Sequence, residues 1–245
     1  MSLTNTSLVN IVMKQLRYKL KAYIGVLLAL ILAQVLGIFI ATLAASVGSV
    51  SNGFYSIEVE SYSSNVVIGF TLIWAFMNAI LISTKAYRED DFTFVANRLS
   101  YNFSNILFII TISTVGAVTA FLSNGIIQIV VYFTSDVEFF LTLGESVEPF
   151  HHGLGLVSTF LYVLLFAITG YLIGMMVQVS KLFLLLIPIC LFAIGYLEQG
   201  GFGFGEIVGF YFLEQSFPLF VIKSLITILI CGSLAILLSN RLEVR

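Results

Sequence analysis

Long apolar stretches constrain this chain more than any other feature of its sequence. Of its 245 residues, 59% are hydrophobic and 10% are charged, whereas a soluble domain carries about 25% charged residues. An apolar stretch of about 20 residues is long enough to cross a bilayer as a helix. The sequence therefore predicts an all-α integral membrane protein, with a single transmembrane domain over residues 1–245.

The apolar stretches predict six transmembrane helices, at about residues 22–47, 63–84, 106–133, 156–179, 182–197 and 218–239. The fifth is short for a span, which normally needs about 17–25 residues, and Pro188 interrupts it. Residues 48–62 are expected to form a short loop. Residues 198–217 are rich in glycine and phenylalanine. They predict a re-entrant segment that dips into the outer leaflet, where protein or water must satisfy its backbone; an ordinary outer loop is the alternative.

Residues 3–21 predict an amphipathic helix that lies in the membrane interface. Apolar side chains recur at helical spacing on one face: Val9, Val12, Met13, Leu16 and Leu20. Three cations fall together on another face, where they reach anionic lipid headgroups: Lys14, Arg17 and Lys21. The alternative is a solvated N-terminal tail whose charges only set the topology.

The distribution of charge predicts the orientation of the chain. Six spans put both termini on one side, and if that side is the cytoplasm, ten of the 11 basic residues face inward, all except Lys223. Nine of the 13 acidic residues then face outward: Glu58, Glu60, Asp136, Glu138, Glu145, Glu148, Glu198, Glu206 and Glu214. Because Lys and Arg concentrate in cytoplasmic loops, we expect both termini to be cytoplasmic.

Small residues at four-residue spacing predict close packing between helices. The first span carries a ladder of them: Ala29, Ala33, Gly37, Ala41 and Ala45. The fourth span carries the pair Gly170 and Gly174. Such a stripe lets another helix approach closely, and for the ladder this helix belongs either to the same chain or to a second subunit. Gln34, in the same span, is interpreted as a packing residue rather than a substrate ligand.

The longest polar interruption is Lys85–Asn105, KAYREDDFTFVANRLSYNFSN, between the second and third spans. It contains three basic and three acidic residues. We expect a cytoplasmic loop with one short helix that contacts another protein. A solvated loop that only maintains topology is the alternative.

The residue types predict no catalytic, cofactor-binding or metal-binding site. The spans hold no nucleophile–base pair, HExxH motif or paired carboxylates, and the chain has no P-loop. Metal binding by Glu148, His151 and His152 is conceivable, but adjacent loop histidines are more often simply exposed. A disulfide between Cys190 and Cys231 is less expected than two packing thiols. No ionisable residue lies at mid-membrane, which disfavours ion-coupled carriers.

The layout resembles the membrane subunits of ATP-binding-cassette (ABC) exporters of the type-2 class. The likeness covers nearly the whole chain: an interface helix, six spans, a polar loop between spans two and three, and a re-entrant segment between spans five and six. The closest local likeness is Phe94–Tyr101, FVANRLSY, in which Arg98 precedes the third span.

The resemblance implies that a short helix at about Glu89–Ala96 couples the chain to a separate cytoplasmic P-loop ATPase, which would bind ATP and magnesium. The implied ATPase-coupling residues are Arg88, Glu89, Asp90, Asp91, Phe92, Phe94 and Arg98. Asp90 and Asp91, at the start of this helix, would interact favourably with its dipole. A second permease subunit, identical or related, would form the pathway with this one, and the ladder of the first span would be part of that interface.

The implied location is a bacterial cell membrane, and the implied partners are the ATPase, the second permease subunit and membrane lipids. No basic stripe indicates binding of nucleic acid. Walls rich in Phe, Ile and Leu favour an amphipathic or apolar cargo, such as an antimicrobial peptide, a lipid-like molecule or a drug. Two other classes stay open: an ATP-independent secondary carrier or channel, and a membrane enzyme or accessory subunit.

Overall fold

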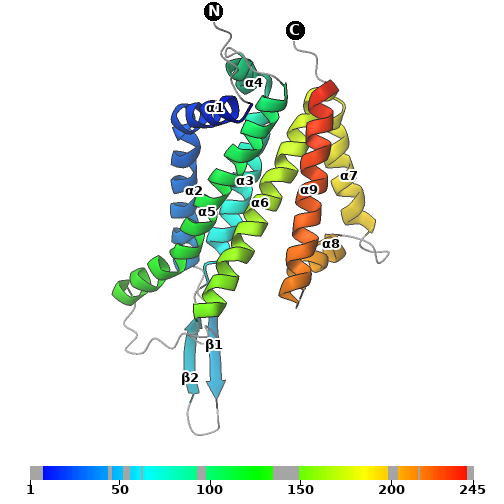
Figure 1. Cartoon of the computed structure of the whole chain (residues 1–245). Helices are drawn as coiled ribbons and strands as arrows, with labels where there is room; N and C mark the ends of the chain where they lie inside the picture. The colour runs from blue at the N-terminus through cyan, green and yellow to red at the C-terminus, as the bar shows by residue number, and fades with distance from the viewer. Residues whose placement is uncertain are drawn as a thin grey trace, which may run out of the picture. The chain divides into compact units, whose positions relative to one another are not determined.

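The computed structural model describes residues 8–43, 46–51, 56–61, 63–92, 98–134, 149–197, 204–214 and 216–241. Helices dominate these residues, with a β-hairpin between the second and third helices (Figure 1). The elements in chain order are α1 (Leu8–Ala22), α2 (Ile24–Leu43), β1 (Ser46–Ser51), β2 (Ser56–Ser61), α3 (Asn65–Ser83), α4 (Lys85–Phe92), α5 (Arg98–Thr134), α6 (Pro149–Val179), α7 (Phe183–Leu197), α8 (Phe204–Phe212) and α9 (Phe217–Arg241).

Five of the described helices are long and apolar enough to cross a membrane: α2, α3, α5, α6 and α9. The mean hydropathy of their most apolar windows ranges from 2.2 to 2.7. α7, which covers the predicted fifth span, has 15 residues and contains Pro188. At 1.5 Å per residue it is about 22 Å long, less than the roughly 30 Å of a hydrocarbon core. The predicted fifth span therefore stays a prediction.

The segment after the first span is not the expected short loop. α2 ends at Leu43, earlier than the predicted limit of Val47. The chain then forms strands β1 and β2, which pair in antiparallel register from Ser46 opposite Ser61 to Ser51 opposite Ser56. The physical reason is local. In β2, Ile57 and Val59 alternate with serine and glutamate, a period of two that favours a strand, and β1 carries the β-branched residues Val47 and Val50.

The chain divides into two compact units. Unit 1 comprises Met1–Ala22, Phe76–Thr111 and Leu164–Arg245, and unit 2 comprises Tyr23–Ala75 and Ile112–Val163. Unit 1 thus contains α1, α4, α7, α8 and α9, whereas unit 2 contains α2 and the hairpin. Helices α3, α5 and α6 each contribute a segment to both units.

In unit 1, α3 and α6 approach each other closely at the two glycines of α6. A Cβ atom on Gly170 would lie 2.5 Å from the carbonyl oxygen of Phe76, and one on Gly174 would overlap the Oγ of Ser83. The amide of Gln178 also donates a hydrogen bond to the carbonyl of Ser83. The prediction that this glycine pair supports close packing is confirmed.

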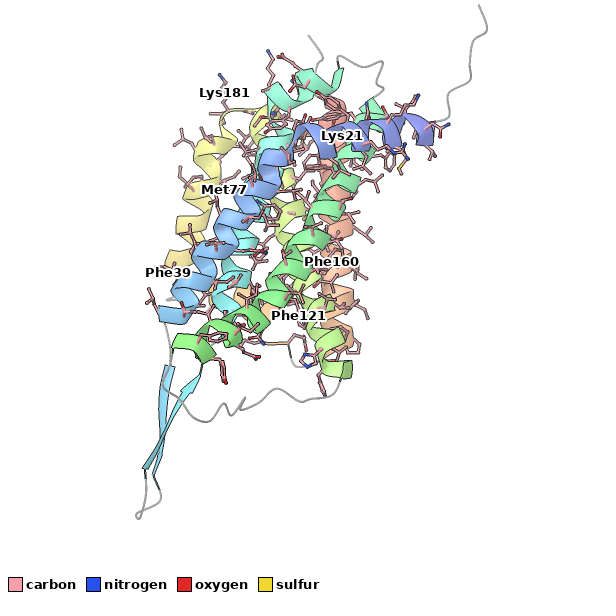
Figure 2. All side chains as sticks on the ribbon, turned by 90° about the vertical axis from the view of Figure 1, so that its left-hand side faces the viewer. Lys21, Phe39, Met77, Phe121, Phe160 and Lys181 are labelled. Carbon is pink, nitrogen blue, oxygen red and sulfur yellow. The ribbon has the colours of Figure 1, made fainter. Side chains whose placement is uncertain are left out.

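The same end of unit 1 holds α1, α4, the turn between α6 and α7, and the end of α9 (Figure 1). Figure 2 shows Lys21 of α1 and Lys181 of the α6–α7 turn at this end. Charged and polar segments of unit 1 that are far apart in the sequence therefore gather at one end of its apolar helices.

In unit 2, part of the small-residue ladder packs against α3 of the same chain. A Cβ atom on Gly37 would lie 3.0 Å from the Cα of Val67. Ala41 is buried in a cluster with Val67, Ile127 and Val131. Gly37 and Ala41 therefore support a contact within the chain. Phe39, between them in sequence, is 61% exposed and labelled on α2 in Figure 2.

The rest of the ladder is less enclosed. Ala29 is exposed and Ala33 is half-buried, while Ala45 lies outside the described residues. A contact with a second subunit stays a prediction, and among the ladder residues whose burial is described, Ala29 and Ala33 are the ones left accessible for it.

Two buried polar side chains in the helices of unit 2, those of Gln34 and Trp74, have partners within the chain. The buried amide of Gln34 donates to Thr119 Oγ1 at 2.9 Å and lies 3.2 Å from both Thr71 Oγ1 and the carbonyl of Gly116. The indole of Trp74 donates to the carbonyl of Val26 at 3.0 Å. Because lipid offers no hydrogen bonds, these contacts account for the polar groups, and the interpretation of Gln34 as a packing residue is confirmed.

Candidate functional site

The predicted coupling segment contains a helix, but its bounds differ from the prediction. α4 runs from Lys85 to Phe92, so it begins four residues before Glu89. A single bend at Thr84 separates it from α3, and the amide of Arg88 donates to the carbonyl of Thr84 at 3.1 Å. Lys85 and Glu89 form an exposed ion pair at 3.4 Å, one helical turn apart. Such a pair supports the short helix by about 0.3–0.5 kcal/mol.

The helix-dipole argument for Asp90 and Asp91 is wrong. Both residues fall in the last turn of α4, and its first turn contains no acidic residue. A carboxylate near a helix C-terminus faces the negative end of the dipole and is mildly unfavourable. Asp90 and Asp91 therefore do not stabilise α4 through the helix dipole.

The structure describes the side-chain surroundings of only some of the predicted coupling residues. Lys85, Glu89 and Asp90 are exposed, and Arg88 is half-buried. Asp91 and Phe92 belong to α4 and Arg98 starts α5, but the surroundings of these three side chains lie outside the description, as does Phe94 altogether. The structure thus brings Arg88, Glu89 and Asp90 together on one short helix.

A buried lysine ties α1 to the start of α5 within unit 1. Lys19 is fully buried. Its ammonium donates to the Oγ of Ser104 at 2.8 Å and to the Oδ1 of Asn105, and it lies 5.3 Å from the centre of the Tyr101 ring. A buried ammonium needs such contacts, because losing its water costs several kcal/mol.

The hydrogen bonds continue from α5 to α6. The amide of Asn105 donates to the hydroxyl of Tyr171 at 3.3 Å, and that hydroxyl donates to the Oδ1 of Asn102 at 3.3 Å. Tyr171 and both asparagines are buried. One polar cluster therefore joins three helices at the end of unit 1 that also holds α4. We call it the Lys19 cluster: Lys19, Tyr101, Asn102, Ser104, Asn105 and Tyr171.

Sequence reasoning missed the Lys19 cluster. It counted Lys19 only as a positive charge on the cytoplasmic side. A signal was present, since YNFSN at residues 101–105 places polar side chains directly before the third apolar stretch. Gln15 and Lys19, one turn apart, are buried on the same face of α1.

α1 presents three different faces. Val12, Gln15 and Lys19 are buried in the chain. Lys14, Arg17 and Lys21 are exposed. Apolar side chains between these faces are also exposed: Val9, Met13 and Leu20. The helix therefore packs on the protein along one face and leaves an apolar and a basic face uncovered.

A pocket of about 370 Å³ lies in unit 2, between the C-terminal part of α5, the N-terminal part of α6 and the residues at the start of α3. Phe121 of α5, labelled in Figure 2, packs edge-on against the ring of His152, with centroids 6.3 Å apart and an angle of 79°. The pocket is lined by Ser64, Ile68, Phe121, Leu122, Asn124, Gly125, Gln128, His152, Gly155 and Thr159.

The structure gives no support to the conceivable metal site. Among the described residues, no group of three or more His, Cys, Asp or Glu side chains is placed to hold a metal ion. His151 and His152 are both exposed on the first turn of α6, and Glu148 lies outside the described residues. The thiol of Cys231 is free and half-buried, so it does not form the alternative disulfide with Cys190.

The predicted re-entrant segment is described from residue 204 to 214 and at residues 216 and 217, and it contains α8. The hydroxyls of Tyr211 and Thr227 are 2.6 Å apart, which ties α8 to α9. Lys223 forms a half-buried ion pair with Glu214 and lies 4.1 Å from the centre of the Phe210 ring. Sequence reasoning treated Lys223 as the one basic residue that does not face inward, and it missed the partner Glu214.

Comparisons with known proteins found no match for this chain among protein-family models, curated proteins or solved structures.

Proposed function

We propose that this chain is the membrane permease subunit of an ATP-driven exporter, energised by a separate cytoplasmic ATPase. The observation that carries the proposal is α4, a charged eight-residue helix set between two helices long enough to span a membrane, with Lys85, Glu89 and Asp90 exposed. Five of its eight residues are charged, so it belongs outside the bilayer. A helix in this position suits docking to a cytoplasmic partner better than it suits contact with lipid.

The environment of α4 supports a role in transmitting movement. α4 follows α3 after a single residue, and α3 packs closely on α6 at Gly170 and Gly174. The first turns of α5 are joined to α1 and α6 by the Lys19 cluster. A displacement of α4 would therefore reach several helices of unit 1 through direct contacts.

The proposed topology has six spans, with α7 and α8 together completing the fifth crossing and its re-entrant continuation. Both termini lie in the cytoplasm of a bacterial cell. α1 lies in the interface, and its exposed faces support this: apolar Val9 and Met13 would face lipid, while Lys14 and Arg17 would meet anionic headgroups.

The coupling surface proposed for the ATPase has the following residues in α4 and beyond it: Arg88, Glu89, Asp90, Asp91, Phe92, Phe94 and Arg98. A second permease subunit, identical or related, would pack on the accessible part of α2, near Ala29 and Ala33. The cargo would be amphipathic or apolar. ATP and magnesium would bind to the ATPase and not to this chain.

The test is co-purification of the tagged chain from its native host in mild detergent, followed by mass spectrometry. We expect a stoichiometric P-loop ATPase to accompany the wild-type chain. The double variant Phe92→Ala/Phe94→Ala should lose most of it because apolar anchors are removed. Phe103→Ala is the matched control, since Phe103 is 47% exposed on α5 outside α4.

The outcomes separate the proposals. If the wild-type chain comes out alone in several detergents with ATP present, an ATP-independent carrier or channel replaces the exporter. If an ATPase accompanies the wild type and the double variant equally, the exporter stands and the α4 assignment is wrong.

A further inference from the structure

The pocket of unit 2 is built by two helix faces that converge. Phe121, Asn124, Gly125 and Gln128 lie at positions i, i+3, i+4 and i+7 of α5, which is one face of a helix. His152, Gly155 and Thr159 lie on one face of α6 by the same spacing. The glycine at 155 allows the two faces to meet, because a Cβ atom there would lie 3.2 Å from Cε2 of Phe121.

The lining offers hydrogen bonds without formal charge. Asn124 and Gln128 each present an amide that both donates and accepts, and His152 and Ser64 add an imidazole and a hydroxyl. Among the lining residues that the structure describes, none is Asp, Glu, Lys or Arg. A phosphate group requires cationic or clustered N–H donors, and an ammonium group requires a carboxylate or an aromatic cage. The chemistry of this lining therefore suits a neutral ligand that carries several hydroxyl groups.

An apolar surface continues from the pocket along α5. Leu122 lines the pocket and is 60% exposed. Ile126 and Ile129 follow it at helical spacing and are also exposed. These residues belong to a helix that is apolar enough to cross a membrane, so their exposed side faces hydrocarbon. A ligand with its polar head in the pocket would lay an acyl chain against this stripe.

We propose that this pocket binds a membrane lipid with a neutral sugar headgroup. Its volume, about 370 Å³, lies at the lower end of the range of ligand pockets, about 300–1,000 Å³, and it accommodates one or two sugar rings rather than a large molecule. The amides, the imidazole and the serine hydroxyl hold the sugar hydroxyls, and the acyl chains stay in the bilayer. The inference does not depend on the proposed ATPase.

The experiment is native mass spectrometry of the purified chain, released from nanodiscs that contain equal amounts of monogalactosyl diacylglycerol, phosphatidylglycerol and phosphatidylcholine with identical acyl chains. We expect the chain to retain the galactolipid at least about tenfold over either phospholipid. Equal retention of all three lipids, or preference for a phospholipid, would overturn the proposal.

Two matched glycine variants locate the binding. Gly125 lines the pocket, whereas Gly153 of α6 does not, and a Cβ atom on either residue meets nothing within 4 Å. Gly125→Leu fills the pocket without straining the helix and should abolish the preference for galactolipid. Gly153→Leu should keep it. Preference that persists in Gly125→Leu refutes this site.

A third variant tests the hydrogen bonds rather than the space. Gln128→Leu removes one amide from the lining, and the loss of one hydrogen-bonding group should reduce the relative retention of galactolipid about threefold to tenfold. Ser233→Leu on α9, exposed and outside the lining, is the control. Unchanged retention in Gln128→Leu would show that polar contacts do not select the lipid.

Discussion

Because the ammonium of Lys19 is buried, we predict effects of mutation on stability that a simple count of contacts would not give. Asn105→Leu removes one acceptor while the charge stays buried beside Ser104 and Tyr101. Losing one hydrogen bond of a buried charged donor costs about 1.5–3 kcal/mol. At about 2–4 °C per kcal/mol for a chain of this size, we expect the melting temperature in detergent to fall by roughly 3–12 °C.

Removing the charge itself should cost less. Lys19→Met loses hydrogen bonds from a charged donor, about 1.5–3 kcal/mol each, but it also removes the desolvation cost of an ammonium, which is several kcal/mol. The two terms nearly cancel, so we expect a loss of about 1 kcal/mol. In the double variant Lys19→Met/Asn105→Leu the leucine no longer faces a charge. The double variant should therefore be more stable than Asn105→Leu alone.

The assay is thermal unfolding of the four proteins of this cycle in one detergent, followed by the fluorescence of Trp74. Asn105→Leu also removes the hydrogen bond from Asn105 to Tyr171. This loss occurs both with the native Lys19 and with Lys19→Met, so its free energy cancels in the cycle. Lys14→Met is the control for the lysine, because Lys14 is exposed on the same helix; its effect should stay within about 0.5 kcal/mol. If the two effects simply add, Lys19 and Asn105 are not coupled and the reasoning fails.

Two further predictions concern packing and charge in unit 1. Gly170→Ala should lower the melting temperature by roughly 2–12 °C, because its Cβ would meet the carbonyl of Phe76 and overpacking costs about 1–3 kcal/mol. Gly232→Ala, where a Cβ meets nothing within 4 Å, should be neutral or stabilising, and an equal loss in both would count against the packing explanation. Glu214→Gln should destabilise the chain more than Lys223→Met/Glu214→Gln does, because it leaves Lys223 half-buried without its anionic partner; melting curves in which the double variant is the less stable one would contradict this.

The helices with a simple apolar pattern could be predicted from the sequence. α3 and α9 form at nearly the residues predicted for the second and sixth spans, and α6 contains the predicted fourth span but begins earlier, at Pro149. Long apolar stretches leave few alternatives in a membrane. The packing role of Gly170 and Gly174 and that of Gln34 also followed from residue type. In these cases one property, size or the need for a hydrogen bond, decides the structure locally.

The hairpin after α2 has a local signal that a rule based on loop length ignores, because β2 alternates apolar and polar residues.

Other features depend on contacts between distant parts of the chain. Lys19 is buried because Ser104 and Asn105, 85 and 86 residues away, accept its hydrogen bonds. The pocket of unit 2 arises only when the faces of α5 and α6 meet. No local pattern contains this information.

The buried contacts of unit 1 also bear on how a movement of α4 would travel. α4 is joined to α3 through Thr84, and α3 is held against α6 by a carbonyl contact at Gly170 and by the bond from Gln178 to Ser83. α5, the next helix after α4 in the sequence, is also held in place, because the Lys19 cluster ties it to α1 and α6. Tightly packed interiors transmit strain rather than absorb it. A partner that pushes α4 would therefore shift α1 and the adjoining parts of α3, α5 and α6 together, and loosening the cluster with Asn105→Leu should weaken that transmission before it weakens the binding of the partner.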